Sequence, residues 1–136
     1  MTETSIDCMH VGVRIDRPAS QVYDFVAEPT NLPRWAPGLG SSVEQVEGRW
    51  VVDSPMGRVG LAFVPRNEHG VLDHHVTLPD GTVFLNPMRV IDDGPVCDVV
   101  FTVRRWPGVS SADFARDVES VTADLERLKA VLEDRG

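Results

Sequence analysis

The spacing of hydrophobic residues changes along the 136-residue chain, and its clearest period lies near the end. Between Ser110 and Glu133, large apolar residues recur every three or four positions. This spacing places six of them on one stripe of a helix: Phe114, Val118, Val121, Leu125, Leu128 and Leu132. Charged residues, Asp117 and Asp124 among them, fall off this stripe. Ser110, with Asp113 three residues later, resembles a capping box. The pattern predicts a long amphipathic helix against which the rest of the chain packs.

The preceding part of the chain shows mainly the period of β-strands. Alternating apolar and polar residues predict a half-buried strand over residues 9–15. Prolines bracket a short helix over residues 18–29 and interrupt a second one over residues 30–38. Beyond it come six strand-like segments joined by turns, of which Asp80-Gly81 is a typical hairpin turn. These segments are residues 41–48, 49–54, 58–66, 70–78, 82–91 and 96–106.

This order of elements predicts an α+β fold in a single domain over residues 1–136. Short connections between consecutive strands favour an antiparallel sheet of seven strands. Such a sheet must curve around the C-terminal helix to cover its apolar stripe. A curved sheet and a straight helix do not fill the space between them completely, so we expect a pocket there.

Composition narrows the possible partners. The net charge of −8 and the pI near 4.8 disfavour binding to nucleic acid or to an anionic surface. No apolar run approaches the roughly 18 residues of a membrane span, so we expect no membrane insertion. The first residues lack the pattern of a secretory signal, which favours a cytoplasmic location. Cys8 and Cys97 have no metal-ligand spacing and are expected to be reduced thiols. We expect no metal and no cofactor.

Several segments resemble a known superfamily. The run VRIDRPASQVYDFVAEPTNLPRWAPGL, residues 13–39, resembles the N-terminal signature of the SRPBCC or START-related helix-grip proteins. The later segments GVLDHHVTLPDG, PMRV and VVFTVRRWPG resemble a bacterial polyketide cyclase/dehydrase-like subgroup. The resemblance implies a hydrophobic cavity between the long helix and the sheet, gated by loops near the second short helix. The superfamily includes lipid carriers, hormone receptors and aromatase/cyclases, so the resemblance does not choose an activity.

Large or polar residues expected to face the interior are the candidate ligand contacts. On the long helix we expect residues 114–121 to face the ligand and residues 125–132 to close the core. Trp35, between prolines, is either a lid over the cavity or a packing anchor. The full set is Trp35, Phe63, His74, Phe84, Asn86, Met88, Phe101, Phe114, Val118 and Val121.

Three polar residues are candidates for catalysis: His74, Asn86 and Arg105. His74 shares a strand face with apolar neighbours, so it either contacts ligand or is satisfied by a neighbouring strand. Asn86 either meets a polar ligand group or bonds backbone near Pro87. Arg105 either pairs with an acidic group at the cavity end or is a surface charge. Asp73 shares a face with His75, which would let its carboxylate orient that imidazole.

Three functions follow from these observations. The leading hypothesis is binding of a small hydrophobic or aromatic ligand in the cavity. One alternative is a polyketide cyclase/dehydratase-like enzyme that uses the same cavity to fold its substrate. Another alternative is a protein-interaction module that forms a homodimer.

Overall fold

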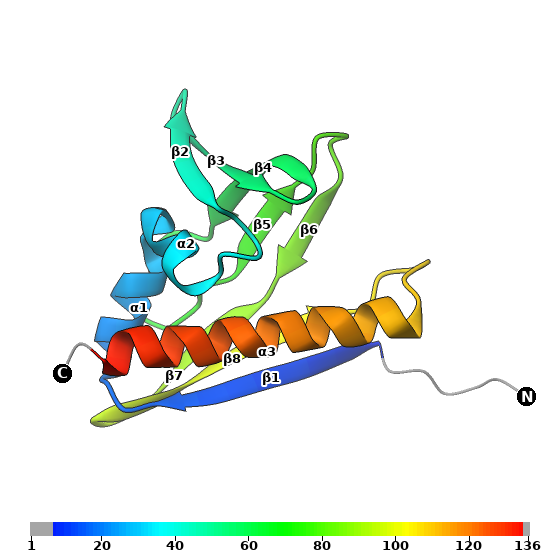
Figure 1. The fold of residues 1–136 in the computed structure, drawn as a ribbon. Coiled ribbons are helices and arrows are strands. Elements are labelled where there is room, and N and C mark those ends of the chain that lie inside the picture. The colour runs from blue at the N-terminus through cyan, green and yellow to red at the C-terminus, as the bar shows by residue number, and fades with distance from the viewer. Residues whose placement is uncertain (1–6, 135–136) are drawn as a thin grey trace, which may run out of the picture.

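The computed structural model describes residues 7–134, and its order of elements is the one that the sequence predicts. One strand, a set of short helices, a series of strands and a long helix follow one another (Figure 1). The elements are β1 (Cys8–Ile15), α1 (Ala19–Ala27), the 3₁₀ helix η1 (Pro29–Asn31), α2 (Leu32–Trp35), β2 (Ser42–Val46), β3 (Arg49–Ser54), β4 (Gly57–Phe63), β5 (His74–Thr77), β6 (Val83–Asn86), β7 (Met88–Asp93), β8 (Val96–Arg104) and α3 (Ser111–Glu133).

The α+β fold is confirmed, but the prediction of one seven-stranded sheet is wrong. Residues 7–134 form eight strands in two antiparallel sheets, ordered β1-β8-β7 and β2-β3-β4-β5-β6. Pro87 causes the difference, because it has no N–H for the ladder and divides the segment predicted as one strand, residues 82–91. Before it, β6 pairs with β5, whereas after it β7 pairs with β8.

The two sheets stay connected near this break. The Leu72 N–H donates to the Met88 carbonyl at 2.8 Å, and Val71 forms an isolated bridge with Arg89. The Val90 N–H donates to the Gly70 carbonyl at 2.9 Å. The loop between β4 and β5 therefore joins the five-stranded sheet to β7.

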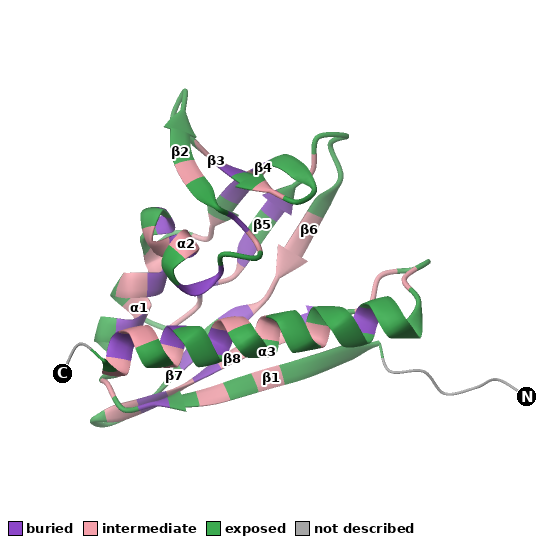
Figure 2. Cartoon of the chain, viewed as in Figure 1, coloured by how far each residue is buried: buried purple, intermediate pink, exposed green. Residues whose placement is uncertain are grey.

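Helix α3 runs along the three-stranded sheet and contacts β1, β8 and α2 (Figure 1). The predicted cap is confirmed, because the Ser110 hydroxyl accepts from the Asp113 N–H at 3.1 Å. Buried and exposed positions alternate along the helix (Figure 2). The ends of the apolar stripe are buried, but Val118 and Val121 in its middle are only half-buried.

The middle of α3 is only partly covered because of the position of the five-stranded sheet. It rises away from α3, while β1, β7 and β8 follow the helix (Figure 1). Helix α2 packs on α3 in the space between, with Leu32 and Trp35 buried. The middle of α3 therefore faces α2 and the end of β8 rather than a continuous sheet, and a cavity lies there.

Candidate functional site

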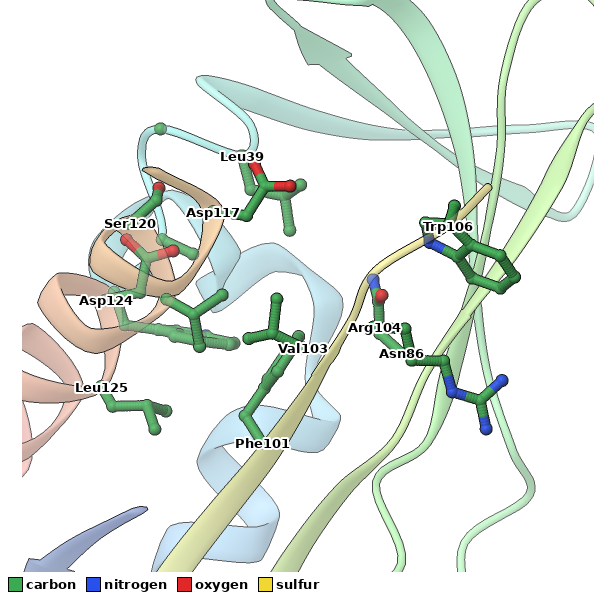
Figure 3. Close-up of a pocket in the computed structure, with 14 residues that line it drawn as sticks. Leu39, Asn86, Phe101, Val103, Arg104, Trp106, Asp117, Ser120, Asp124 and Leu125 are labelled. Atoms are coloured by element: carbon green, nitrogen blue, oxygen red, sulfur yellow. The ribbon is translucent and has the colours of Figure 1, made fainter. Parts of the chain in front are cut away.

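A cavity of about 230 Å³ lies between α3, the α2 region and the C-terminal end of β8 (Figure 3). At roughly 30 Å³ per liquid water, that is room for several waters, so this interface is not fully packed. Its wall mixes aromatic and aliphatic side chains with a few polar ones. The lining residues are Trp35, Ala36, Gly38, Leu39, Asn86, Phe101, Val103, Arg104, Trp106, Asp117, Ser120, Val121, Asp124 and Leu125.

Local structure explains why these residues meet. Alternation along β8 turns Phe101 and Val103 inward, as the sequence predicts. Helix α2 ends at Trp35, and the chain then folds back through a turn in which the Leu39 N–H donates to the Ala36 carbonyl at 3.0 Å. The five lining residues of α3 lie at helical spacings of three and four, which puts them on one face: Asp117, Ser120, Val121, Asp124 and Leu125.

Trp35, one of the lining residues, has a polar atom without a partner. Its side chain is 3% exposed, yet Nε1 is buried and has no hydrogen-bond partner. Among residues 7–134 it is the only buried side-chain nitrogen or oxygen in this state. A buried donor without an acceptor costs about 1–3 kcal/mol, so an acceptor reaching Nε1 would recover that free energy.

Two carboxylates lie at the cavity, of which Asp124 is half-buried and Asp117 is exposed. Burial raises the pKa of Asp124 to about 6, although the nearby Arg127 guanidinium lowers it in part. Burial, with repulsion from Asp113, also raises the pKa of Asp117. Neither carboxylate forms a salt bridge within residues 7–134. Asp124 can therefore exchange a proton near neutral pH, as a general acid or base requires.

The structure brings four of the ten predicted ligand contacts to the cavity wall: Trp35, Asn86, Phe101 and Val121. The other six lie outside it: Phe63, His74, Phe84, Met88, Phe114 and Val118. Met88 is completely buried, and Phe84 packs on the Trp106 ring at a centroid distance of 5.1 Å. The proposed division of α3 also shifts, because the cavity borders residues 117–125 and includes Leu125.

His74 faces the interior, as its apolar neighbours Leu72 and Val76 predict. Its Nδ1 lies 3.0 Å from the Leu72 carbonyl oxygen, so its partner is on its own segment rather than a neighbouring strand. Its ring packs between Phe63 and Phe101, with centroid distances of 5.0 and 5.8 Å. Burial lowers the pKa of His74, which favours the neutral imidazole. The residue is a satisfied part of the core.

Arg105 does not continue the inward face of β8, because the strand ends at Arg104. Its Nε donates to the Val109 carbonyl at 3.0 Å and so holds the loop before α3. Arg104 lines the cavity in its place.

Asp73 is likewise engaged elsewhere and does not orient His75. Its carboxylate accepts from the Met88 N–H at 2.9 Å and pairs with Arg89 at 3.0 Å. Its desolvation is outweighed by these contacts, so the pKa of Asp73 is lowered.

Sequence reasoning missed the polar side of the cavity, made by Asp117, Ser120 and Asp124. A signal was present, since Asp117 and Asp124 are seven residues apart and flank Val118 and Leu125 of the apolar stripe. Within residues 7–134 no three His, Cys, Asp or Glu side chains gather in a way that suits a metal ion. None of the helices in this part of the chain combines the length and apolar character of a bilayer crossing.

A long C-terminal helix against antiparallel strands, with a cavity beside it, defines the START-related helix-grip class. The sequence model described as polyketide cyclase / dehydrase and lipid transport matches residues 8–133, and the chain belongs to that family. A search of curated proteins gave no match.

Solved structures share the fold. The protein XoxI from Bacillus cereus is 16% identical with a TM-score of 0.72, covering 95% of this chain and 97% of that one. A START superfamily protein from Mycobacterium smegmatis is 14% identical with a TM-score of 0.68, covering 96% and 99%. The di-domain ARO/CYC BexL of the BE-7585A biosynthetic pathway is 20% identical with a TM-score of 0.69, covering 94% of this chain and 47% of that one. At these identities the likeness shows the fold alone.

Proposed function

We propose that this protein binds a small, mostly apolar or aromatic molecule in the cavity between α3, α2 and β8. The observation that carries the proposal is a cavity whose wall includes the aromatic side chains of Trp35, Phe101 and Trp106. Ligand sites typically combine an apolar wall with a few polar groups that orient the ligand. Family membership supports the same kind of function.

The size of the cavity limits the ligand. Its volume of about 230 Å³ lies below the roughly 300–1,000 Å³ typical of sites for drug-sized molecules. The proposed ligand therefore has one or two rings rather than a long acyl chain, unless the α2 region moves outward on binding.

Native mass spectrometry of the purified protein, together with fluorescence titration of the neutral two-ring dye 2-naphthol, tests the proposal. Val121 lines the cavity, so Val121→Phe should fill part of it and weaken dye binding about tenfold or more, a loss of roughly 1.4 kcal/mol. Val118→Phe is the matched control, because Val118 is equally half-buried on α3 but lies outside the cavity wall.

A retained small molecule, or dye binding that Val121→Phe weakens and Val118→Phe does not, would support the proposal. Dye binding equally affected by both variants would place the site elsewhere. Absence of any retained molecule and of any dye binding would refute ligand binding in this cavity.

Proton-transfer catalysis in the same cavity is the second candidate, favoured by the near-neutral pKa of Asp124. Asp124 would exchange a proton with a polyketide-like substrate that the apolar wall folds. Of the three catalytic candidates taken from the sequence, only Asn86 lines this cavity. Cyclisation of a poly-β-ketone analogue whose rate depends on a group titrating near pH 6, and is lost in Asp124→Asn, would support it; a rate independent of Asp124 would exclude this role.

A further inference from the structure

Asn86 brings a polar side chain from the interior face of β6 to the cavity wall. It pairs in register with His74 of β5, whose side chain is buried. Directly opposed residues of an antiparallel pair point to the same face of the sheet, so Asn86 also points to the interior. Figure 3 shows its amide group between the side chains of Val103 and Trp106, across the cavity from α3.

The side-chain amide of Asn86 forms no hydrogen bond within residues 7–134. It therefore does not bond the backbone near Pro87, which was one of the two alternatives from the sequence. Asn86 is half-buried, and Trp35 Nε1 is the only side-chain nitrogen or oxygen of residues 7–134 that is sealed from solvent without a partner. The amide of Asn86 thus keeps accessible surface, with its carbonyl acceptor and its N–H donors both free.

The chain around Asn86 holds the residue in place. The Thr102 N–H donates to the Pro87 carbonyl at 3.0 Å, and the Met88 N–H donates to the Asp73 carboxylate at 2.9 Å. Pro87 also restricts the backbone of the residue before it to extended conformations. A polar group that is already fixed loses little conformational freedom when it binds a ligand. Asn86 is therefore suited to orient a ligand in the cavity.

We propose that Asn86 selects a one- or two-ring ligand that carries a hydrogen-bond donor beside a carbonyl acceptor, as a lactam does. The ligand N–H or O–H donates to the side-chain oxygen of Asn86, and the ligand carbonyl accepts from its amide nitrogen. This inference rests on the proposed function and names the class of ligand. A wholly apolar molecule would displace water from the amide without replacing the hydrogen bonds, which weakens binding. A site built to hydrogen-bond a ligand group also rejects analogues that lack the group.

Calorimetric titration with a matched pair of neutral probes tests the inference. The compounds 2-quinolone and coumarin share two fused rings and a carbonyl, but coumarin has a ring oxygen where 2-quinolone has an N–H. At neutral pH the wild type should bind 2-quinolone about tenfold or more tighter than coumarin, as expected when a polar group loses its partner. Asn86→Leu, which replaces the amide by an apolar group of similar size, should abolish this preference. Gln45→Leu removes an amide from an exposed position outside the cavity and should retain it.

A second measurement uses the wild type alone, so the inference remains testable even if Asn86→Leu does not fold. In nitrogen–proton NMR spectra, 2-quinolone should shift the side-chain amide resonances of Asn86 more than coumarin does. Binding of 2-quinolone that leaves these resonances unchanged would overturn the inference.

The outcomes separate this inference from the proposed function. Equal affinity of the wild type for both probes, or a preference that persists in Asn86→Leu, would overturn the inference and leave ligand binding intact. Binding of the dye 2-naphthol without binding of either probe would also overturn it. Failure of the dye and both probes together would instead refute the proposed function.

Discussion

Asp124 is the residue at which the structure departs furthest from an ordinary surface carboxylate. Its pKa is raised to about 6 from 3.8, because partial burial disfavours the charged form. The stabilising effect of this protonated form is complete below the ordinary Asp value and is lost as the pH rises through about 6. Asp124→Asn, which is neutral at every pH, should keep that stabilisation.

We therefore expect Asp124→Asn to be more stable than the wild type at pH 8 but not at pH 4. After discounting for solvent screening of this half-buried group, the gain at pH 8 should be about 1 kcal/mol. Urea unfolding of both proteins across this range measures it. Glu126→Gln, on the exposed face of α3, should leave the pH dependence of the wild type unchanged. A gain that is equal at pH 4 and pH 8 would show that burial of Asp124 does not set its titration.

At the level of single elements, the start of α3 gives a direct test of its sequence signal. The Ser110 hydroxyl accepts from the Asp113 N–H and satisfies one of the free donors of the first turn. Ser110→Ala should lower the free energy of unfolding by about 1 kcal/mol. Ser111→Ala, one residue inside the helix, should cost much less, because alanine is the better helix former. Thermal unfolding of both variants makes the comparison, and equal losses would argue against capping by Ser110.

The junction between the sheets depends on Gly70. Its φ is +72°, and an added Cβ would lie 2.2 Å from the Val90 carbonyl oxygen. Gly94 has almost the same φ, +71°, but open space at the Cβ position. Gly94→Ala should therefore show the left-handed strain alone, about 1–2 kcal/mol. Gly70→Ala should lose at least about 1 kcal/mol more in urea unfolding, because the backbone of β7 must move. Similar losses of unfolding free energy in the two variants would show that β7 can move away from an added Cβ at residue 70 without destabilising the protein.

Most helices and strands could be predicted from the sequence because the periodicity of their hydrophobic residues is a local property. The stripe of α3, its cap and the alternation of β8 depend only on neighbouring residues, and all three are confirmed. The division at Pro87 carried a local signal as well, since proline cannot sit in the middle of a ladder. The sequence carried no local signal for which of the two sheets β7 would join, because the pairing of β7 with β8 is a long-range interaction.

The cavity could be predicted as a kind of site but not residue by residue. A long helix packed against curved strands implied a pocket between them. The helical periodicity alone could not show that α2 and β8 would lie opposite residues 117–125 of α3. Asp117 and Asp124 were placed outside the apolar stripe. The pattern of one helix does not show which other elements will pack beside that stripe. The sequence pointed to Arg105 rather than Arg104 because the predicted strand extended to residue 106, whereas β8 ends at Arg104.

At the scale of the whole molecule, the remaining question is self-association. Large exposed apolar residues within residues 7–134 are spread over different strands and turns: Met9, Val46, Met56, Val83 and Ile91. Val46 and Val83 belong to β2 and β6, the two edges of the five-stranded sheet. Isolated apolar residues of this kind are normal on monomeric proteins.

We therefore expect a monomer rather than the homodimer that remained an alternative from the sequence. A net charge of −8 on each copy adds repulsion, which salt screens within about 8 Å at physiological ionic strength. Light scattering at low and high salt should give the mass of one chain, 15.0 kDa, independent of protein concentration. A mass that doubles with concentration, and more readily in salt, would support a homodimer. Val83→Lys would then place it, since a charge on the β6 edge should abolish pairing there while a change on the opposite edge, Val46→Lys, should not.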